Sequence, residues 1–245
     1  MRKNPPMSNH KYSIITVCLN AITHIHRTAE SLTQQNYTNF EWIVIDGGST
    51  DGTLDILEEY KDLISVLVSE PDKGIYDAMN KGILHAKGQD LLFLNAGDSL
   101  YDPKTLSSLD RSSNFELIVG NLFLTQTRTV RESPQLLPRD FLLKVMLPHQ
   151  ATFFNRDIFD KYGYFDTSYR IAGDYEMFSR LIQKYKVSYT HVPDIIANFD
   201  ETGISSNDNF RHLRKQENHR VRWKYFPRYR YSLKSIRQVV RNFTK

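Results

Sequence analysis

The 245-residue sequence lacks most features that mark a specialised class of protein. A single cysteine, Cys18, excludes an intramolecular disulfide framework and is typical of a reducing compartment. No apolar run approaches the roughly 18–20 residues of a membrane-spanning helix. The longest such run, Leu117–Leu124, is interrupted by Gly120 and Asn121. The polar N-terminal segment does not resemble a signal peptide, so we expect a cytoplasmic protein.

Glycine-rich phosphate-binding motifs are also missing. A G-x-G-x-x-G fingerprint would follow the first strand, but residues 18–23 contain no glycine, and no P-loop motif occurs elsewhere. A nucleotide bound by this chain is therefore not held by a loop of either type. Internal repeats and a linker rich in proline, glycine or serine are absent as well, which argues against two autonomous domains.

Charge is distributed unevenly along the chain, and the net charge of +4 describes neither part of it. Residues 1–210 carry 20 basic and 27 acidic residues, a net charge of −7, whereas residues 211–245 carry 12 basic residues against Glu217 alone. Six aromatic residues lie among these basic ones: Trp223, Tyr225, Phe226, Tyr229, Tyr231 and Phe243. This basic tail predicts a solvated surface helix, a nucleic-acid patch or a contact with anionic lipid.

The remaining composition, 40% apolar and 24% charged, is that of a folded globular chain and excludes intrinsic disorder. Strands are expected over Tyr12–Leu19, Trp42–Ile45, Ile64–Ser69, Leu91–Leu94, Glu116–Leu124, Ala151–Phe154 and Val187–Val192. Helices are expected over His24–Gln35 and Thr53–Tyr60, from Ile75 to a C-cap at Gly88, and from near Asp174, with a polar loop over Asn198–Asn207. The alternation in the first half predicts an α/β fold with a mostly parallel central sheet flanked by helices.

Polar residues follow directly after three of these strands, at Asn20, at 46–49 and at 95–98. Because the carboxyl ends of parallel strands meet at one edge of a sheet, these loops are expected to converge on one crevice. The candidate ligand groups are the carboxylates Asp46, Asp51, Asp72, Asp77 and Asp98. Such groups can hold a divalent cation that binds a diphosphate, or accept hydrogen bonds from a nucleobase or a sugar.

Structural explanations compete with these ligand roles. Asp46 and Asp51 flank a turn that opens a helix, and Asp98 also fits an ordinary turn. Asp77 can pair with Lys81 one helical turn later. Asp174 stands where an N-cap is expected, His149 can be a core histidine beside two phenylalanines, and Cys18 can be a small buried apolar residue.

Four segments stand in the order and spacing of glycosyltransferase family 2: Thr16–Asn20, Ile43–Thr53, Ala78–Ile83 and Phe93–Asp98. Three later segments, His149–Phe154, Gly163–Asp166 and Ala172–Glu176, resemble the branch of this family that builds bacterial surface polysaccharides, including colanic-acid-type transferases. The resemblance covers residues 12–205. It implies the GT-A fold, a Rossmann-like architecture that binds nucleotide-sugar donors.

The resemblance also implies roles for individual residues. Asp174 matches the general base of an inverting transferase, and Asp98 matches the last acid of the metal-binding element for Mn²⁺ or Mg²⁺. Asp46 is expected to accept a hydrogen bond from the nucleobase. Further donor contacts are expected from Asn20, Gly48, Asp77, Asn80, Asn95 and Gly97, and acceptor contacts from His149, Gln150 and Glu176. The family commonly has acids at positions 95 and 97, so the metal is expected to bind mainly together with the nucleotide.

These roles divide the chain into a GT-A domain over residues 10–206 and a basic aromatic extension over 207–245. Within the domain, 10–100 is expected to bind the nucleotide-sugar and 101–206 the acceptor. The expected reaction moves a sugar, from a UDP-sugar in the first instance, to a hydroxyl of a lipid-linked glycan in cell-surface polysaccharide synthesis. Since that acceptor lies in the inner leaflet, residues 211–245 are expected to bind an anionic membrane and not nucleic acid. This predicts a cytoplasmic protein attached peripherally to the inner face of the cell membrane. The alternative is a catalytically silent nucleotide- or glycan-binding protein of the same fold.

Overall fold

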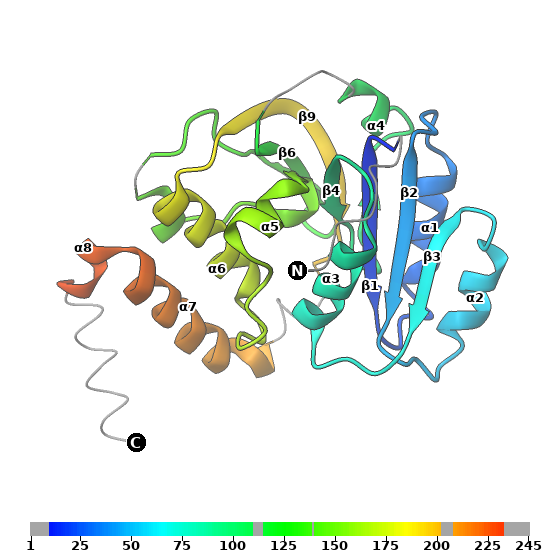
Figure 1. Ribbon diagram of the computed structural model, residues 1–245, viewed down its shortest axis with the longest axis horizontal. Helices are drawn as coiled ribbons and strands as arrows, with labels where there is room; N and C mark the ends of the chain where they lie inside the picture. The colour runs from blue at the N-terminus through cyan, green and yellow to red at the C-terminus, as the bar shows by residue number, and fades with distance from the viewer. Residues whose placement is uncertain (1–9, 110–114, 139, 202–207, 233–245) are drawn as a thin grey trace.

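A nine-stranded mixed sheet runs through the molecule, with helices on both of its faces (Figure 1). The computed structural model describes residues 10–109, 115–138, 140–201 and 208–232. The strands follow the order β3-β2-β1-β4-β8-β6-β9-β5, and β7 pairs with β6. This α/β architecture, a sheet covered by helices, confirms the predicted α/β class.

The first half of the chain builds the parallel part of the sheet. Its strands are β1 (Tyr12–Cys18), β2 (Phe40–Asp46), β3 (Ile64–Ser69) and β4 (Asp90–Phe93), and its helices are α1 (Ile25–Thr33), α2 (Thr53–Glu59) and α3 (Ile75–His85). Strand β1 pairs in parallel with both β2 and β4, and β2 pairs in parallel with β3.

Strand β1 is buried along its whole length because both of its faces are covered. In β1, Ile15 and Val17 belong to the core that α3 covers, whereas Ile14 and Cys18 belong to the core that α1 and α2 cover. Successive side chains of a strand point to opposite faces, so a strand between two helical layers is mostly apolar on both of them. Cys18 is therefore a buried core residue, as one of the interpretations of the sequence proposed.

The predicted helix C-cap at Gly88 is wrong. Helix α3 ends at His85, and its C-cap is Ala86 in an extended conformation. The N–H of Gly88 instead donates to Ser13 Oγ at 2.8 Å. A Cβ at position 88 would lie 2.6 Å from the backbone of β1, so glycine is required there by a close approach of two chain segments.

The second half is less regular and completes the sheet. It contains β5 (Ser99–Leu100), α4 (Thr105–Ser108), β6 (Leu117–Leu124), β7 (Thr129–Arg131), the 3₁₀ turns η1 (Phe141–Leu143) and η2 (His149–Ala151), β8 (Thr152–Asn155), α5 (Asp157–Tyr162), α6 (Gly173–Ser179), the π-helical η3 (Arg180–Tyr185) and β9 (Tyr189–Phe199). Strand β8 runs antiparallel to both β4 and β6, and so joins the two halves. The parallel arrangement is thus mainly a property of the first half.

Strand β9 is longer than the sequence predicts, since it extends to Phe199 through residues expected to begin a polar loop. The side chain of Asn198 donates to Ser99 Oγ at 3.0 Å and to the carbonyl of Leu100 at 3.2 Å. These contacts fasten the end of β9 to β5, nearly a hundred residues earlier in the chain, so no local pattern announces them. Residues 202–207 of the expected loop lie outside the described residues.

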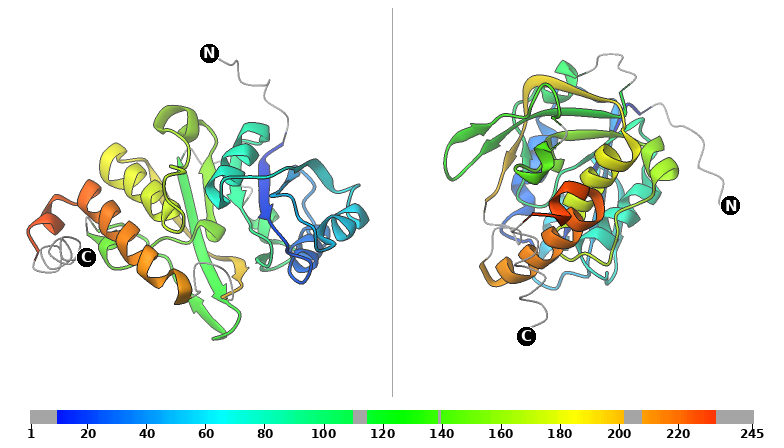
Figure 2. Two further views of the ribbon diagram at one scale, coloured as in Figure 1. Left: turned by 90° about the horizontal axis from the view of Figure 1, so that it is seen from below. Right: turned by 90° about the vertical axis from the view of Figure 1, so that its left-hand side faces the viewer.

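The described part of the basic tail is packed on the domain and is not separate from it. It forms η5 (Asp208–Phe210), α7 (Arg211–Tyr225) and α8 (Pro227–Arg230), and α7 lies alongside α6 (Figure 2). Val221, Tyr225 and Phe226 belong to the same apolar core as α3, α5 and α6. Among the residues that the structure describes, no helix is long and apolar enough to cross a membrane.

Candidate functional site

The loops that follow β1, β2 and β3 leave the sheet at one edge. In the parallel register Cys18 lies opposite Asp46, and Asp46 lies opposite Ser69, so the three strands end level with one another. The segment after β4 continues along the same edge, with the N–H of Ala96 donating to the carbonyl of Val17 at 3.3 Å. The predicted convergence of the polar loops is therefore present in the structure.

Asp46 is buried and occupied by hydrogen bonds from its own surroundings. Its Oδ2 accepts from the N–H of Gly48 at 3.1 Å, the N–H of Ser49 at 2.9 Å and Ser69 Oγ at 2.7 Å, and its Oδ1 accepts from Ser49 Oγ. Burial alone would raise the pKa of Asp46, but these hydrogen bonds outweigh it and hold the pKa below its usual value. Asp46 thus shapes the loop after β2, and its hydrogen bond with a nucleobase stays a prediction.

The neighbouring loop after β1 is held to the same turn. Asn20, in the left-handed conformation with φ of 49°, is exposed and accepts the N–H of Thr50 on Oδ1 at 3.0 Å. Asp51 accepts from the N–H of Thr53 at 3.0 Å and from the N–H of Ile22 at 3.0 Å. Its observed contacts are those of the turn-forming residue that the structural explanation of the sequence described.

Asp72 lies against the loop after β2, although its sequence position is 26 residues further on. A Cβ at Gly47 would lie only 2.6 Å from Asp72 Oδ2, so glycine at position 47 lets this carboxylate approach the backbone. The other oxygen, Oδ1, accepts from the N–H of Gly74 at 2.7 Å. Asp77 completes this turn by accepting the N–H of Lys73 at 3.0 Å. Asp72 is therefore the carboxylate that lies over the turn where Asp46 was expected to meet a ligand.

Two predicted interactions of α3 differ from those in the structure. Lys81 pairs with Glu70 at 2.8 Å, and no ion pair with Asp77 forms among the described residues. Asn80, which was expected to contact the donor, uses its amide to hold the backbone of Phe165, donating to the carbonyl at 2.9 Å and accepting the N–H at 3.0 Å. The contacts of Asn80 therefore fasten the acceptor half to α3.

Asp98 is buried beside a second carboxylate, that of Asp200 at the end of β9. Its Oδ1 accepts the N–H of Asp200 at 3.0 Å, and Gly97, with φ of 100°, brings the chain within reach of the Asp200 side chain. Burial raises the pKa of Asp98 to about 7, and the negative charge of Asp200 adds to this rise, although the Asp200 N–H and the charge of His149 oppose it. At neutral pH a bound proton thus reduces the cost of burying this carboxylate beside another one.

These residues fit a hard divalent cation, provided that the donor supplies further ligands. Asp98 and Asp200 offer carboxylate oxygens, and Asn95 Oδ1 is a buried acceptor without a hydrogen-bond partner among the described residues. Over the same residues, no group of three His, Cys, Asp or Glu side chains is arranged to hold a metal ion. A Mg²⁺ or Mn²⁺ ion usually completes such a shell with phosphate oxygens and water.

Asp174 lies in the first turn of α6, with a residue exposure of 9%. Its Oδ1 accepts from the N–H of Tyr175 at 2.7 Å and from Tyr76 Oη at 3.3 Å, and its Oδ2 lies 3.3 Å from His149 Nδ1. The last contact brings the two groups together without the geometry of a hydrogen bond. The ring of Tyr76 reaches this position because residue 173 is glycine, where a Cβ would lie 2.7 Å from the ring. Asp174 is therefore not the N-cap, which is Ala172.

His149 connects the loop after β4 with α6. Its Nε2 lies 3.3 Å from Asn95 Nδ2, which can only donate, so the ring proton is placed on Nδ1 and faces Asp174. The side chain of Gln150 hydrogen-bonds Asp98. The structure thus brings together Asn95, Asp98, His149, Gln150 and Asp174, as the sequence led us to expect.

Arg131, on β7, is a cation near Asp174 that the sequence reasoning missed. Burial lowers the pKa of its guanidinium, and the negative charge of Asp174 opposes that shift. Its Nη2 donates to the carbonyl of Met146. Tyr76 was also missed as a member of the site, because its position depends on contacts between segments distant in the chain. Asp200 begins the loop over 200–205 that was expected to contribute to donor choice, and its contact with Asp98 was not foreseen.

Glu176 does not reach this site. It is 1% exposed, and its carboxylate accepts from Arg180 Nε at 3.2 Å, Lys224 Nζ at 3.3 Å and Tyr225 Oη. These partners come from η3 and α7, on the side of α6 away from Asp174. We therefore leave Glu176 out of the acceptor site.

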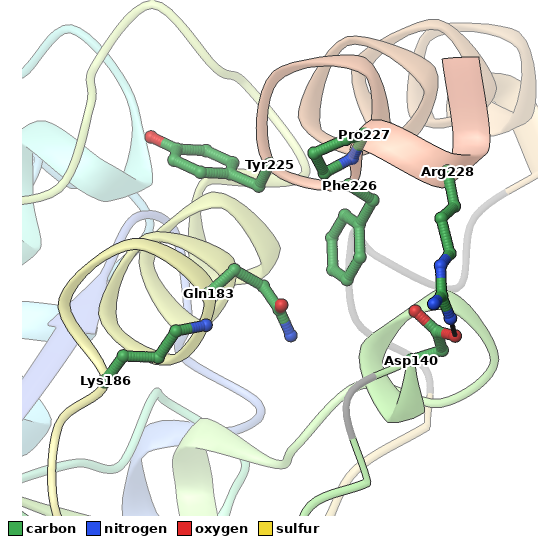
Figure 3. A pocket seen from close by; sticks show the side chains of 7 residues that line it. All are labelled: Asp140, Gln183, Lys186, Tyr225, Phe226, Pro227 and Arg228. Carbon is green, nitrogen blue, oxygen red and sulfur yellow. Dashed lines mark ion pairs between the residues drawn. The ribbon is translucent and has the colours of Figure 1, made fainter. Parts of the chain in front are cut away.

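A separate hollow lies where α7 and α8 meet η1 and η3 (Figure 3). Its lining is Asp140, Gln183, Lys186, Tyr225, Phe226, Pro227 and Arg228, and Arg228 pairs with Asp140 at 3.7 Å. None of the predicted catalytic or donor-binding residues lines it. The predicted site residues therefore lie outside this hollow.

Comparison with known proteins identifies close relatives in sequence. Residues 13–165 match the family model described as glycosyl transferase family 2. A Mycobacterium tuberculosis PGL/p-HBAD biosynthesis glycosyltransferase is 31% identical over 208 residues, covering 82% of this chain and 81% of the relative. The putative teichuronic acid biosynthesis glycosyltransferase TuaG of Bacillus subtilis is 35% identical over 109 residues, 42% of this chain and 43% of that protein.

Solved structures share the fold at lower sequence identity. Staphylococcus aureus TarS 1–349 in complex with UDP-GlcNAc superposes with a TM-score of 0.68 and 18% identity, covering 86% of this chain and 66% of that one. The chain spans only 44% of a longer TarS structure. The mannosyltransferase PcManGT of Pyrobaculum calidifontis, in complex with GDP-Man and Mn²⁺, superposes with a TM-score of 0.65 and 20% identity, covering 89% of this chain and 66% of that one.

Proposed function

The chain belongs to glycosyltransferase family 2, and from that membership we propose that it transfers a sugar from a nucleotide-sugar to a hydroxyl of a lipid-linked glycan, with inversion at the anomeric carbon. The names of its relatives, which describe polysaccharide and glycolipid biosynthesis, support such an acceptor. The complexes of similar structures with UDP-GlcNAc and GDP-Man support a nucleotide-sugar donor. We retain a UDP-sugar as the first donor to test.

One observation carries the proposal. The Asn95–Asp98 loop, which would hold the donor diphosphate, is connected through His149 to Asp174, which would act on the acceptor. Two groups that must act on opposite sides of one reacting carbon therefore lie on neighbouring segments, at the edge where ligands of open α/β sheets bind.

Asp174 is the residue that we propose as the general base. Its Oδ1 is held by the N–H of Tyr175 and the hydroxyl of Tyr76, so Oδ2 is the oxygen left to take a proton from the attacking hydroxyl. The His149 ring lies next to Oδ2, with Nδ1 at 3.3 Å. A positioned base contributes about 10²- to 10⁴-fold to a rate.

On the donor side, Asp98, Asp200 and the free oxygen of Asn95 would hold a divalent cation together with the diphosphate. When bound, such a cation neutralises the charge that grows on the leaving nucleotide. The nucleotide would meet the exposed Asn20 and the half-buried Gly48 on the loops after β1 and β2, whereas Gly97 is buried and donates its N–H to Thr28 Oγ1 at 3.0 Å.

A thermal-shift screen followed by a turnover assay tests the proposal. UDP-GlcNAc, UDP-glucose, UDP-galactose and GDP-mannose are each added with Mn²⁺ or with EDTA, and the matching donor should raise the melting temperature by mass action. Nucleoside diphosphate release is then measured with that donor, and NMR of the product defines its anomeric configuration. Binding without any turnover would support the catalytically silent alternative. A retained configuration would contradict the inverting mechanism.

The outward side of α7 supports the proposed contact with an anionic membrane. Arg211, Lys215 and Trp223 are exposed, and the one acid of α7, Glu217, is buried. Tyr231, just after α8, is 86% exposed. Basic and aromatic side chains together suit the headgroup region of a bilayer. Residues 233–245 of the predicted membrane-binding segment lie outside the described residues.

We expect the protein to bind phosphatidylglycerol vesicles at low salt and to release them at high salt, because exposed charges are screened. Arg211→Gln with Lys215→Gln should weaken this binding about 30-fold, since each basic residue contributes about 1 kcal/mol. Trp223 provides the readout as a blue shift of fluorescence, because the other tryptophan, Trp42, is fully buried.

The matched control carries Lys61→Gln with Lys104→Gln, which makes the same change in charge at two exposed positions outside the basic tail. Equal vesicle binding by the two double variants would exclude α7 as the membrane surface. Absence of binding to anionic vesicles by the parent would exclude peripheral attachment through this segment.

A further inference from the structure

Glu217, the buried carboxylate of α7, holds the segment that leads to Asp174. Its Oε1 accepts the N–H of Arg170 at 2.8 Å, and its Oε2 accepts the N–H of Ile171 at 2.9 Å and of Ala172 at 2.8 Å. Three successive backbone donors thus converge on one side chain that comes from 45 to 47 residues later in the chain. Charged acceptors form the stronger class of hydrogen bond, especially when buried.

The same segment is held from its other side by α3. Tyr76 Oη donates to the carbonyl of Ile171 at 2.8 Å, and its ring lies against Gly173. The chain from Arg170 to Asp174 is therefore fixed between a tyrosine of the donor half and a glutamate of α7. Without Glu217, three N–H groups before α6 would lose their acceptor, and the segment would be held from one side only.

The packing around Glu217 holds α7 in the position from which Glu217 reaches the N–H groups of residues 170–172. Arg220 lies over the ring of Tyr169 at 4.3 Å and donates to Ser168 Oγ at 3.0 Å, and Arg170 lies over the ring of Phe210 at 5.4 Å. Arg220 thus fastens α7 to the 168–172 segment, and Arg170 fastens the same segment to η5, which leads into α7.

We propose that Glu217 is a positioning residue for Asp174: by accepting the N–H groups of residues 170–172, it sets the place of the base relative to the donor. This inference rests on the proposed function, in which Asp174 takes the proton. Glu217 itself touches neither substrate in this arrangement. Because a misplacement of the order of 1 Å can cost about 10²-fold in rate, the effect of Glu217 should appear in kcat.

Glu217→Gln tests the inference, since glutamine keeps the size of the side chain but turns one acceptor oxygen into an amide donor that faces N–H groups. We expect kcat for nucleoside diphosphate release, with the donor selected above, to fall about 10- to 100-fold. The affinity for UDP or GDP should stay unchanged, because the predicted nucleotide-binding loops lie on the first half of the chain. In Asp174→Asn the additional Glu217→Gln change should have no further effect, since the base is already lost.

Glu41→Gln is the matched control. Glu41 is also a buried carboxylate that binds backbone, accepting from the N–H of Lys87 at 2.5 Å and of Gly88 at 3.0 Å, beside the start of β1 and away from Asp174. Both variants should lower the melting temperature, but Glu41→Gln should leave kcat unchanged below it. A kcat of Glu217→Gln equal to that of Glu41→Gln would overturn the positioning role and leave the proposed function intact. No turnover by the parent, or full turnover by Asp174→Asn, would instead overturn the proposed function and the inference with it.

Discussion

Asp174→Asn is expected to lower the rate of sugar transfer by about 10²- to 10⁴-fold, the loss that follows when a positioned general base is removed. The substitution keeps the shape of the site, because an asparagine oxygen can still accept from the N–H of Tyr175 and from the Tyr76 hydroxyl. What it removes is the basicity of the second oxygen, which faces His149. Nucleotide affinity, measured by calorimetry with UDP or GDP, should therefore stay unchanged while turnover falls.

Asp157→Asn provides the control for this variant. Asp157 also lies in the first turn of a helix, α5, and it is exposed to solvent, so the same chemical change there should leave turnover at the parental level. If Asp174→Asn keeps more than about a tenth of the parental rate, a different group takes the proton, and Asp174 then has only a structural role.

Asp98→Asn is expected to stabilise the protein at pH 8 when EDTA is present. Burial raises the pKa of Asp98 in the folded state to about 7, above its ordinary value of 3.8, so between these values the native state holds a proton that the unfolded state has released. The parent therefore loses stability as pH rises from 3.8 to 7. The loss is about 1.4 kcal/mol for each pH unit over which the folded state holds one proton more than the unfolded state. Asparagine does not titrate, and the variant escapes this loss.

We therefore compare the free energy of unfolding of Asp98→Asn with that of the parent at pH 4 and at pH 8. The difference in favour of the variant should be larger at pH 8, by at most about 4 kcal/mol. In thermal unfolding this corresponds to about 10 °C. The variant should also lose the Mn²⁺-dependent part of donor binding. Asp62→Asn, at an exposed position, is the control and should not open such a gap. If the difference in stability between parent and variant does not change with pH, the pKa of Asp98 is not raised in the folded state.

Asp98 is a buried carboxylate that costs stability and is kept for its chemistry. Asp98 and Asp200 lie on segments more than a hundred residues apart, and the negative charge of Asp200 adds to the burial that raises the pKa of Asp98. A cation between them would replace the proton that one of them holds at neutral pH. This gives a physical reason for binding the metal together with the nucleotide, as the sequence predicts from the missing acids at positions 95 and 97.

Much of the fold could be predicted from local pattern. The strands β1, β2 and β4 are recognisable because apolar residues lie on both of their faces, and β3 because it is rich in β-branched residues, although every second residue is exposed. The helices between them show one buried side each. The predictions that are wrong concern residues whose structure depends on contacts with a segment distant in the sequence. Gly88 is required by the backbone of β1 and not by a helix end, and β9 continues to Phe199 because Asn198 meets β5.

The candidate site shows the same limit among its acids. Asp46, Asp51, Asp98, Asp174 and Glu176 all stand in suggestive positions in the sequence, but their surroundings differ. Asp46 is occupied by four hydrogen bonds from serine and backbone groups, and Glu176 faces Arg180 and α7. Only Asp98 and Asp174 retain an arrangement that suits the proposed chemistry. A sequence motif shows which residue types are present, whereas the hydrogen-bond partners in the folded chain determine which of them can bind a ligand.

The unequal distribution of charge was evident from the residues alone, as were the α/β class, the absence of a phosphate-binding glycine loop and the gathering of acids after the strands. These properties depend on composition and on periods of two or three to four residues, which the chain carries locally. The role of the basic tail was not evident. Glu217, its one acid, turns inward to hold the backbone before Asp174, and its neighbours pack α7 against that segment. Such contacts join residues more than forty positions apart, and only the folded chain brings them within hydrogen-bonding distance.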